Sequence, residues 1–197
     1  MTVVGYLSGS IPVGLLVGRV WGFDPRTIGS GNIGTTNVAR AGGKIPGAVT
    51  FMADVLKGFA PVELSRLVLG SAASTLATVG FAAFLGSIAS VFLKFRGGRG
   101  VATSFGVWLA LAPLAIGVVA GIFAVVLLVT RIVSLSSLTG ALALPPTVAV
   151  LNCPAPYLLA AILTTALVLV RHSENIGRLI RGEEPSIGRG TTDNLGS

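Results

Sequence analysis

Apolar runs long enough to cross a membrane as helices recur along this chain. One of them, Val101 to Val129, holds 29 residues without one charged side chain. Only 11% of the 197 residues are charged, whereas a soluble domain carries about 25%. Because a bilayer offers no water to backbone N–H and C=O groups, such runs must form helices. The sequence therefore predicts an all-α integral membrane protein, with one domain over residues 1–183.

About seven transmembrane helices are expected. The run from Val101 to Val129 is too long for one untilted span, and Pro113 divides it into a short helix and a longer one; a single kinked helix is the competing interpretation. The sixth span runs to about Leu151, and Pro145–Pro146 can break it. The other spans are expected at Val3–Val20 (with a kink at Pro12 and closely packed glycines), Gly47–Leu69, Ala72–Leu93 and Tyr157–Val170.

Four polar segments connect or follow these spans. Trp21–Pro46 has 26 residues, too many for an idle connection, and is expected to be a functional loop. Arg131–Ser137 is expected to be a hydroxyl-rich turn, and Arg171–Leu179 a polar, helix-compatible segment. Residues 184–197 are expected to form a disordered tail.

The cations indicate the orientation of the chain. With seven spans, twelve of the fourteen Lys and Arg residues fall on one side, while Lys57 and Arg66 lie within the second span. The positive-inside rule makes that side cytoplasmic, with the N-terminus external and the C-terminus cytoplasmic. The net charge of +7 then reflects membrane orientation, and no nucleic-acid partner is expected.

The same side gathers groups suited to phosphate binding. Glycines let backbone N–H groups approach an anion, while hydroxyls, amides and cations supply further donors. Anchoring of basic loops to lipid headgroups would explain the arginines but not the Gly/Asn/Thr pattern. A substrate with a phosphate head and an apolar tail suits the cluster better. Its candidate residues are Ser30, Asn32, Thr36, Asn37, Arg40, Gly97, Gly98, Arg99, Ser134, Ser136, Ser137, His172 and Asn175.

Other kinds of site are excluded or left open. Gly29-x-Gly31-x-x-Gly34 matches a dinucleotide fingerprint, but no strand precedes it. With one cysteine and one histidine, neither a Cys-based nor a His-rich metal site is expected, and no cofactor is predicted. Lys57 joins the phosphate-binding candidates because charge at membrane depth is functional by default; a self-neutralising pair with Asp54 is the alternative.

Three segments resemble, in order and spacing, the signatures of the bacterial acyl-phosphate:glycerol-3-phosphate acyltransferase family, known as PlsY. They are Ser30–Arg40, Phe95–Thr103, and Arg171–Leu179 with Gly182 and Glu183. The resemblance implies seven helices in the bacterial cytoplasmic (inner) membrane and a site facing the cytoplasm. It implies transfer of a fatty acyl group from acyl phosphate to the sn-1 hydroxyl of glycerol 3-phosphate, giving lysophosphatidic acid and phosphate.

The resemblance also implies roles for the candidates. Ser30, Arg40, Arg99 and the Ser136–Ser137 turn would hold phosphate groups, and His172 with Asn175 would position the substrates and polarise the acyl phosphate. The first loop would be shaped by Asn32, Thr36 and Asn37. The expected partners are the two substrates, membrane lipid and an enzyme that synthesises acyl phosphate.

The chain departs from the family pattern at three positions. Ser87 replaces a usual histidine, Ser90 a usual proline, and Arg99 a usual lysine, whose charge arginine keeps with a different geometry. Three alternatives therefore stay open: a diverged paralogue with reduced or altered acyltransferase activity, a catalytically silent scaffold, and a transporter of a small phosphorylated solute.

Overall fold

Residues 1–187, the part of the chain that the computed structural model describes, form α-helices and two short 3-10 turns without any strand. The all-α prediction is confirmed. The elements are α1 Thr2–Ser10, α2 Val13–Val20, η1 Pro25–Thr27, α3 Thr35–Gly42, α4 Lys44–Leu69, α5 Ala73–Ile88, η2 Val91–Leu93, α6 Val101–Leu111, α7 Pro113–Thr130, α8 Val133–Val150, α9 Ala155–Arg171 and α10 Ser173–Ile180.

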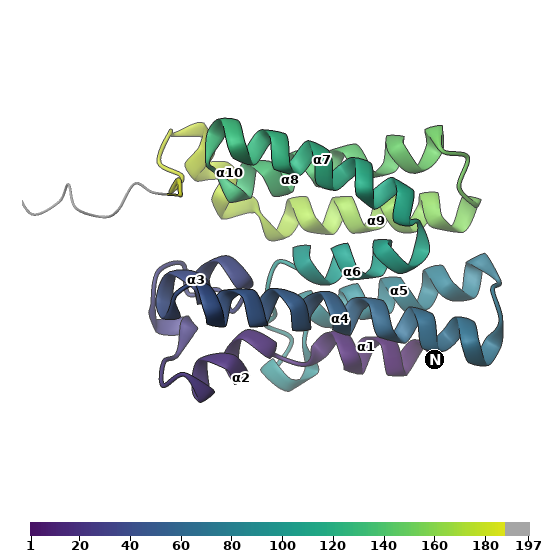
Figure 1. The fold of residues 1–197 in the computed structure, drawn as a ribbon, viewed down its shortest axis with the longest axis horizontal. Helices are drawn as coiled ribbons and strands as arrows, with labels where there is room; N and C mark the ends of the chain where they lie inside the picture. The colour runs from purple at the N-terminus through teal and green to yellow at the C-terminus, as the bar shows by residue number, and fades with distance from the viewer. Residues whose placement is uncertain (188–197) are drawn as a thin grey trace, which may run out of the picture.

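The long helices run side by side along the longest axis of the molecule (Figure 1). Helices α1, α4 and α5 make one layer, α7, α8 and α9 make the other, and α6 lies between them in contact with α4, α5, α7 and α9. The largest apolar core surrounds α6, where Val107 and Trp108 pack among Val62, Val148 and Ala161. The short α6 therefore joins the two layers.

A helix stands at each of the seven expected spans. Within residues 1–187, five segments are long and apolar enough to cross a membrane: Thr2–Val20, Lys44–Leu69, Ala73–Leu93, Pro113–Thr130 and Val133–Val150. A sixth results if α9 and α10 count as one bent span. Because α6 has only 11 residues, the number of complete crossings and the orientation of the termini stay predictions.

The first span is broken, not merely kinked, because Pro12 separates α1 from α2. The Ile11 carbonyl oxygen that the break exposes accepts a hydrogen bond from Lys57 Nζ at 3.0 Å. The predicted close packing of glycines is confirmed: a Cβ at Gly9 would clash with the backbone of Ala83 in α5, and a Cβ at Gly5 with the Val79 carbonyl oxygen.

The prediction of an unbroken loop over Trp21–Pro46 is wrong. Thr35–Gly42 forms α3, and α4 begins at Lys44. Val38 on α3 is fully buried against Val13 and Val17 of α2, so packing supports this short helix. Pro46 lies in the first turn of α4, where N–H groups have no partner within the helix and a missing donor costs little.

The prediction of a turn at Arg131–Ser137 is also wrong, because α8 begins at Val133 and includes the serines. Nor do Pro145 and Pro146 break α8, which continues to Val150. Pro145 cannot donate to the carbonyl oxygen of Ala141, four residues earlier, but Thr165 Oγ1 of α9 donates to it at 2.7 Å. A neighbouring helix thus replaces the missing hydrogen bond.

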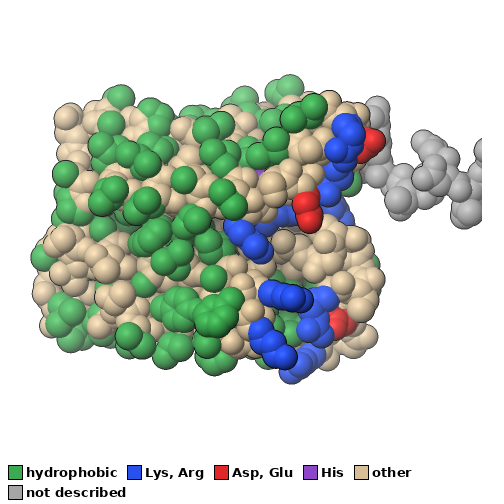
Figure 2. Space-filling model, turned by 180° about the vertical axis from the view of Figure 1, so that it is seen from behind, with side chains coloured by type: hydrophobic (Ala, Val, Ile, Leu, Met, Phe, Trp, Pro, Cys, Tyr) green, Lys and Arg blue, Asp and Glu red, His purple; other side chains and the backbone are tan. Residues whose placement is uncertain are grey.

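Pro113 does separate two helices, α6 and α7, as predicted. The helix-compatible segment after the last span is confirmed as α10, which bends away from α9 by 62° at His172. Lys and Arg side chains gather at the end of the molecule that holds α3 and α10 (Figures 1 and 2). The domain division stays a prediction, since residues 188–197 lie outside the described part.

Candidate active site

Asn37 on α3 holds the first polar loop in shape. Its side-chain Nδ2 donates to the carbonyl oxygens of Pro25 at 2.7 Å, Ile28 at 3.0 Å and Asn32 at 2.8 Å. Its Oδ1 accepts from the backbone N–H of Ser30 at 3.0 Å. The side chain is 2% exposed and its polar atoms are committed to backbone. Asn37 therefore acts on a ligand only through the loop.

The loop wraps the start of α3. Gly29 and Gly31 have φ values of +59° and +66°, a region that favours glycine. Asn32 Oδ1 accepts from the backbone N–H of Gly34 at 2.8 Å, and Gly34 precedes the first helical residue. Thr36, in the first turn, is half-buried. The loop thus leads directly into the first N–H groups of α3, and such groups at the start of a helix are of the kind that binds anions.

Arg40 follows Thr36 by one turn on the same face of α3. Its side chain is exposed, and its charge influences Arg99 of the second polar loop. Burial lowers the pKa of the Arg99 guanidinium, the charge of Glu184 opposes this, and the charges of Arg178 and Arg40 lower it further. Arginine stays protonated despite such shifts. Three guanidinium groups thus share one region.

The second polar loop is fixed by backbone contacts on both sides. Gly97 and Gly98 donate to the carbonyl oxygens of Ile88 and Ser87 at the end of α5. Their own carbonyl oxygens accept from Arg171 at 2.8 and 3.2 Å. A Cβ on Gly97 would clash with Ser87 O, so glycine is required there. Arg99 is consequently held at the junction of α5 and α9.

The two loops lie against each other. A Cβ built on Gly98 would stand 3.5 Å from Asn32 Oδ1 and 3.8 Å from Ile33 Cγ1. Segments more than 60 residues apart in the sequence are therefore neighbours in the fold. The charge of Arg99 also lowers the pKa of His172, so the third polar segment, which contains His172, lies beside the first two loops.

His172 lies at the bend between α9 and α10 and is 2% exposed. Its Nδ1 is 2.8 Å from the Val168 carbonyl oxygen, an acceptor only, so Nδ1 carries the proton. Burial lowers the pKa of His172; the bond to Val168 opposes this, and the charge of Arg99 lowers it further. The imidazole is therefore neutral near pH 7, with a lone pair on Nε2.

Asn175, one turn into α10, is also 2% exposed. Its Nδ2 donates to Glu184, while its Oδ1 is buried without a partner within the described residues. Glu184 also accepts from Arg178 Nε at 2.7 Å. Burial raises the pKa of Glu184, but Ser134, Asn175 and Arg178 outweigh it and lower that pKa, so the carboxylate is charged. The unpaired Oδ1 of Asn175 and the charged carboxylate of Glu184 thus lie beside the arginines.

Sequence reasoning missed two residues of this network, Arg178 and Glu184. Arg178 follows Asn175 by three residues, a spacing that places both on one helix face. Glu184 had been assigned to the tail, yet its side chain is only 6% exposed.

Some predicted site residues have other contacts. The hydroxyls of Ser136 and Ser137 donate to Ile132 O and Val133 O of their own helix, at 2.9 and 2.8 Å. Lys57 Nζ pairs with Asp54 Oδ1 at 2.7 Å and with Ile11 O, so its contacts are those of a structural pair. Ser87 and Ser90, which differ from the family pattern, donate to the carbonyl oxygens of Phe84 and Ser10, respectively.

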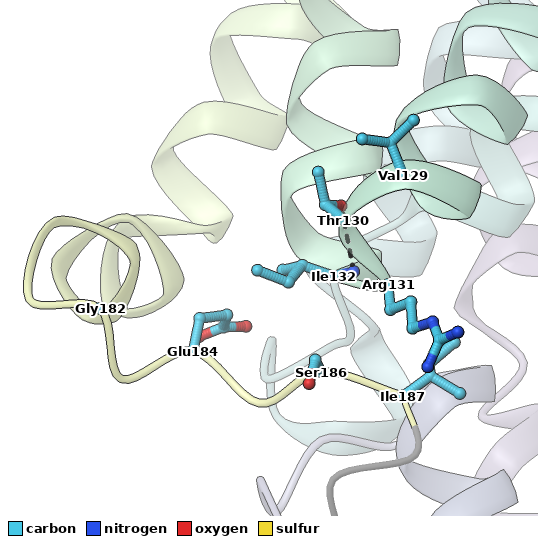
Figure 3. A pocket seen from close by; sticks show the side chains of 8 residues that line it. All are labelled: Val129, Thr130, Arg131, Ile132, Gly182, Glu184, Ser186 and Ile187. Atoms are coloured by element: carbon cyan, nitrogen blue, oxygen red, sulfur yellow. Dashed lines mark hydrogen bonds between the residues drawn. The ribbon is translucent and has the colours of Figure 1, made fainter.

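A polar pocket of about 340 Å³ lies between the α7–α8 turn and the segment that follows α10 (Figure 3). The Ile187 N–H donates to the Arg131 carbonyl oxygen at 2.7 Å and closes one side. Glu184, on the same segment as Ile187, also lines the pocket (Figure 3). This carboxylate therefore separates the pocket from Asn175 and Arg178.

A second cavity, about 160 Å³ in volume and almost wholly apolar in lining, lies between α4, α6, α7, α8 and α9. One end is marked by Val101, two residues after Arg99, by Ser137, and by Val168, whose carbonyl oxygen binds His172. Phe105, Ile116, Leu144 and Thr164 also line it, deeper in the bundle. This apolar crevice begins beside the polar groups described above.

Comparison with known proteins gives one consistent result. A family model described as glycerol-3-phosphate acyltransferase matches residues 1–182. A glycerol-3-phosphate acyltransferase of Rubrobacter xylanophilus is 46% identical over 191 residues, covering 95% of this chain and 94% of that protein. One of Geobacter sulfurreducens is 45% identical over 185 residues, covering 93% and 94%.

Two crystal structures of PlsY (YgiH), an integral membrane glycerol 3-phosphate acyltransferase, have the same fold. The glycerol 3-phosphate form superimposes with a TM-score of 0.91 at 38% identity, covering 95% of this chain and 94% of that one. The lysophosphatidic acid form gives 0.89 at 38% identity, covering 95% and 93%. With a matching family model, relatives of near-equal length and a shared membrane fold, this chain belongs to the glycerol-3-phosphate acyltransferase family.

Proposed function

We propose that this protein transfers a fatty acyl group from acyl phosphate to the sn-1 hydroxyl of glycerol 3-phosphate, with lysophosphatidic acid and phosphate as products. The observation that carries the proposal is the meeting of the three polar segments around Arg99, directly beside an apolar crevice. The activity of the relatives and the ligands named for the two PlsY structures support it.

Phosphate recognition rests on Arg40, Arg99 and the first loop. Among the described residues, five carboxylates pair with Arg26, Lys57, Arg66, Arg178 and Arg181, Glu174 forms no ion pair, and neither Arg40 nor Arg99 is ion-paired. The charges of Glu184 and Glu174 act on Arg99 without forming an ion pair with it, and the charge of Arg40 opposes them. A bound phosphate would give both guanidinium groups a direct anionic partner. Ser30 and the leading N–H groups of α3 complete the site, in a shape that Asn37 maintains.

The chemistry requires orientation more than activation, because an acyl phosphate already has a good leaving group. The glycerol hydroxyl oxygen bonds to the carbonyl carbon, and the bond from that carbon to the phosphate oxygen breaks, its electron pair leaving with phosphate. The hydroxyl proton passes to a substrate phosphate oxygen. His172 orients the attacking hydroxyl through its Nε2 lone pair, Asn175 offers its unpaired Oδ1, and Arg99 stabilises the developing charge on phosphate.

No covalent acyl-enzyme forms in this scheme. The hydroxyls of Ser136 and Ser137 are bound to their own helix, and Cys153 lies in the α8–α9 connection, at the end of the molecule away from α10 (Figure 1). Rapid quenching with a radiolabelled acyl phosphate, followed by denaturation, should leave no label on the protein. A labelled Ser or Cys would overturn the scheme.

The decisive assay uses purified protein in lipid nanodiscs with acyl phosphate and labelled glycerol 3-phosphate. Lysophosphatidate formation that requires acyl phosphate supports the proposal. Arg40→Ala and His172→Ala should abolish product without loss of folding, whereas Arg181→Ala should keep wild-type turnover, since Arg181 pairs with exposed Glu183. Uptake of glycerol 3-phosphate into vesicles without acylation would instead support a transporter. If the protein showed neither acylation nor uptake, a catalytically silent scaffold would be supported.

We also propose that the site faces the cytoplasm from the bacterial cytoplasmic membrane, where an enzyme that makes acyl phosphate can deliver its product. The gathering of cations at one end supports this orientation (Figure 2). The opposite end holds Cys153, the single cysteine. A membrane-impermeant maleimide should label Cys153 in spheroplasts from outside. Labelling that requires lysis would reverse the orientation.

A further inference from the structure

The apolar crevice has one wall where a side chain is missing. Four residues of α8 line it at helical spacing: Ser137, Gly140, Ala141 and Leu144. From Ser137 to Leu144 the helix rises about 10 Å. Gly140 therefore stands about midway along the crevice, between the polar end beside His172 and the deep end.

Glycine at position 140 is not required by the backbone. It lies inside α8 with no left-handed torsion angle. A Cβ added there would meet Val119 Cγ1 at 3.4 Å and Phe123 Cβ at 3.9 Å, both ordinary contact distances. By contrast, a Cβ at Gly106 of α6 would clash with the Val55 carbonyl oxygen. Since glycine weakens a helix relative to alanine, what it provides at position 140 is space.

The volume that a side chain at position 140 would fill belongs to the crevice, because Val119 and Phe123 of α7 line the same cavity. A side chain at 140 would project between α7 and α8 and divide the polar end from the deep end. The deep end would then be closed to an apolar chain that begins at the polar groups.

We propose that Gly140 determines the length of acyl chain that the enzyme accepts, by leaving the crevice continuous from the His172 end to Leu144. The inference rests on the proposed function, with the acyl chain of the donor seated in the crevice. Gly140 touches the chain far from the reacting atoms and is a specificity-determining residue, not a catalytic one.

The test compares Gly140→Ala and Gly140→Leu with wild type over saturated acyl phosphates of increasing length, in nanodiscs of one lipid composition. For Gly140→Leu, kcat/KM with long donors should fall at least about tenfold relative to short donors. Gly140→Ala should show a smaller shift in the same direction. An equal loss at every chain length, or an unchanged profile in a folded Gly140→Leu protein, would overturn the proposal.

Matched controls come from α7, where Gly117 and Gly121 have no atom within 4 Å of an added Cβ. Gly117→Leu should keep the wild-type chain-length profile. If Gly140→Leu alters folding, Gly140→Leu with Val119→Ala restores volume at the same spot and should regain long donors; failure of this rescue in a folded double variant counts against the proposal. Wild-type protein inactive with every acyl phosphate would refute the proposed function itself, a separate outcome.

Discussion

Replacing Asn37 tests how the first loop is built. Asn37→Ala removes an amide with four hydrogen bonds to backbone groups. Each such bond contributes a net ~0.5–1.5 kcal/mol, so the four sum to ~2–6 kcal/mol. Water can re-enter a loop at the polar end of the molecule, which favours the lower half of that range. We expect the ordered loop to lose ~2–4 kcal/mol.

The matched substitution Asn37→Asp distinguishes shape from hydrogen bonding. Asp keeps the size of the side chain and an acceptor for the Ser30 N–H, but it sets a charged oxygen against the carbonyl oxygens of Pro25, Ile28 and Asn32. Repulsion replaces attraction at each of them. Although nearly isosteric, Asn37→Asp should be at least as damaging as Asn37→Ala.

The assay is kcat/KM for glycerol 3-phosphate in nanodiscs, together with protease susceptibility of the first loop. A loss of ~3 kcal/mol of loop order corresponds to a fall of about 100-fold. Exposed Asn152, in the α8–α9 connection, provides the control: Asn152→Asp should leave kcat/KM unchanged. Wild-type kcat/KM in Asn37→Asp, or a protected loop with lost activity, would refute this account of Asn37.

Three further predictions follow from the site and from α8. Arg99→Lys keeps the charge but loses the two-pronged guanidinium, so kcat/KM for glycerol 3-phosphate should fall about tenfold; an unchanged value would show that charge alone suffices. Because burial lowers the pKa of His172, kcat should be constant near neutral pH and fall only when acidification charges the imidazole, below its ordinary pKa of about 6.5. The stability of the fold should fall over the same acidic range, since folding favours the neutral imidazole. A kcat that rises on acidification would contradict the assignment of a neutral His172. Thr165→Val should destabilise the protein by ~1–3 kcal/mol by leaving the Ala141 carbonyl oxygen unpaired, and by less in a Pro145→Ala background, where residue 145 regains an N–H; equal unfolding costs in both backgrounds would rule out this coupling.

The positions of the long helices could be predicted because hydropathy acts locally. The errors lie where a distant segment decides the outcome. The pair Pro145–Pro146 predicts a break in the helix. Thr165, 20 residues after Pro145, instead supplies the hydrogen-bond donor that Pro145 lacks, and α8 continues. The segment of α3 is too polar and too short for a hydropathy signal, and the burial of Val38 against α2 makes it helical.

The same distinction separates the predictable part of the site from the rest. Glycines beside hydroxyls and cations indicate phosphate binding from sequence alone, because the chemistry of each residue type suffices. The pairing of charges cannot be predicted in this way, since it depends on which carboxylate the fold brings to which cation. Lys57 was counted among phosphate ligands, but Asp54, three residues away, neutralises it within the bundle.

Glu184 shows why that balance matters for function. Its carboxylate is committed to Arg178 and Asn175. Of the other carboxylates described among residues 1–187, four pair with cations other than Arg40 and Arg99, and Glu174 forms no ion pair. The fold thus pairs one guanidinium of the cluster with a carboxylate and leaves Arg40 and Arg99 without an ion pair, while the charges of Glu184 and Glu174 act on Arg99 from farther away. Because Arg40 and Arg99 still repel each other, an anion that binds both would stabilise the site. We therefore propose that Arg178 and Glu184 support the phosphate site and that Arg40 and Arg99 contact the substrate.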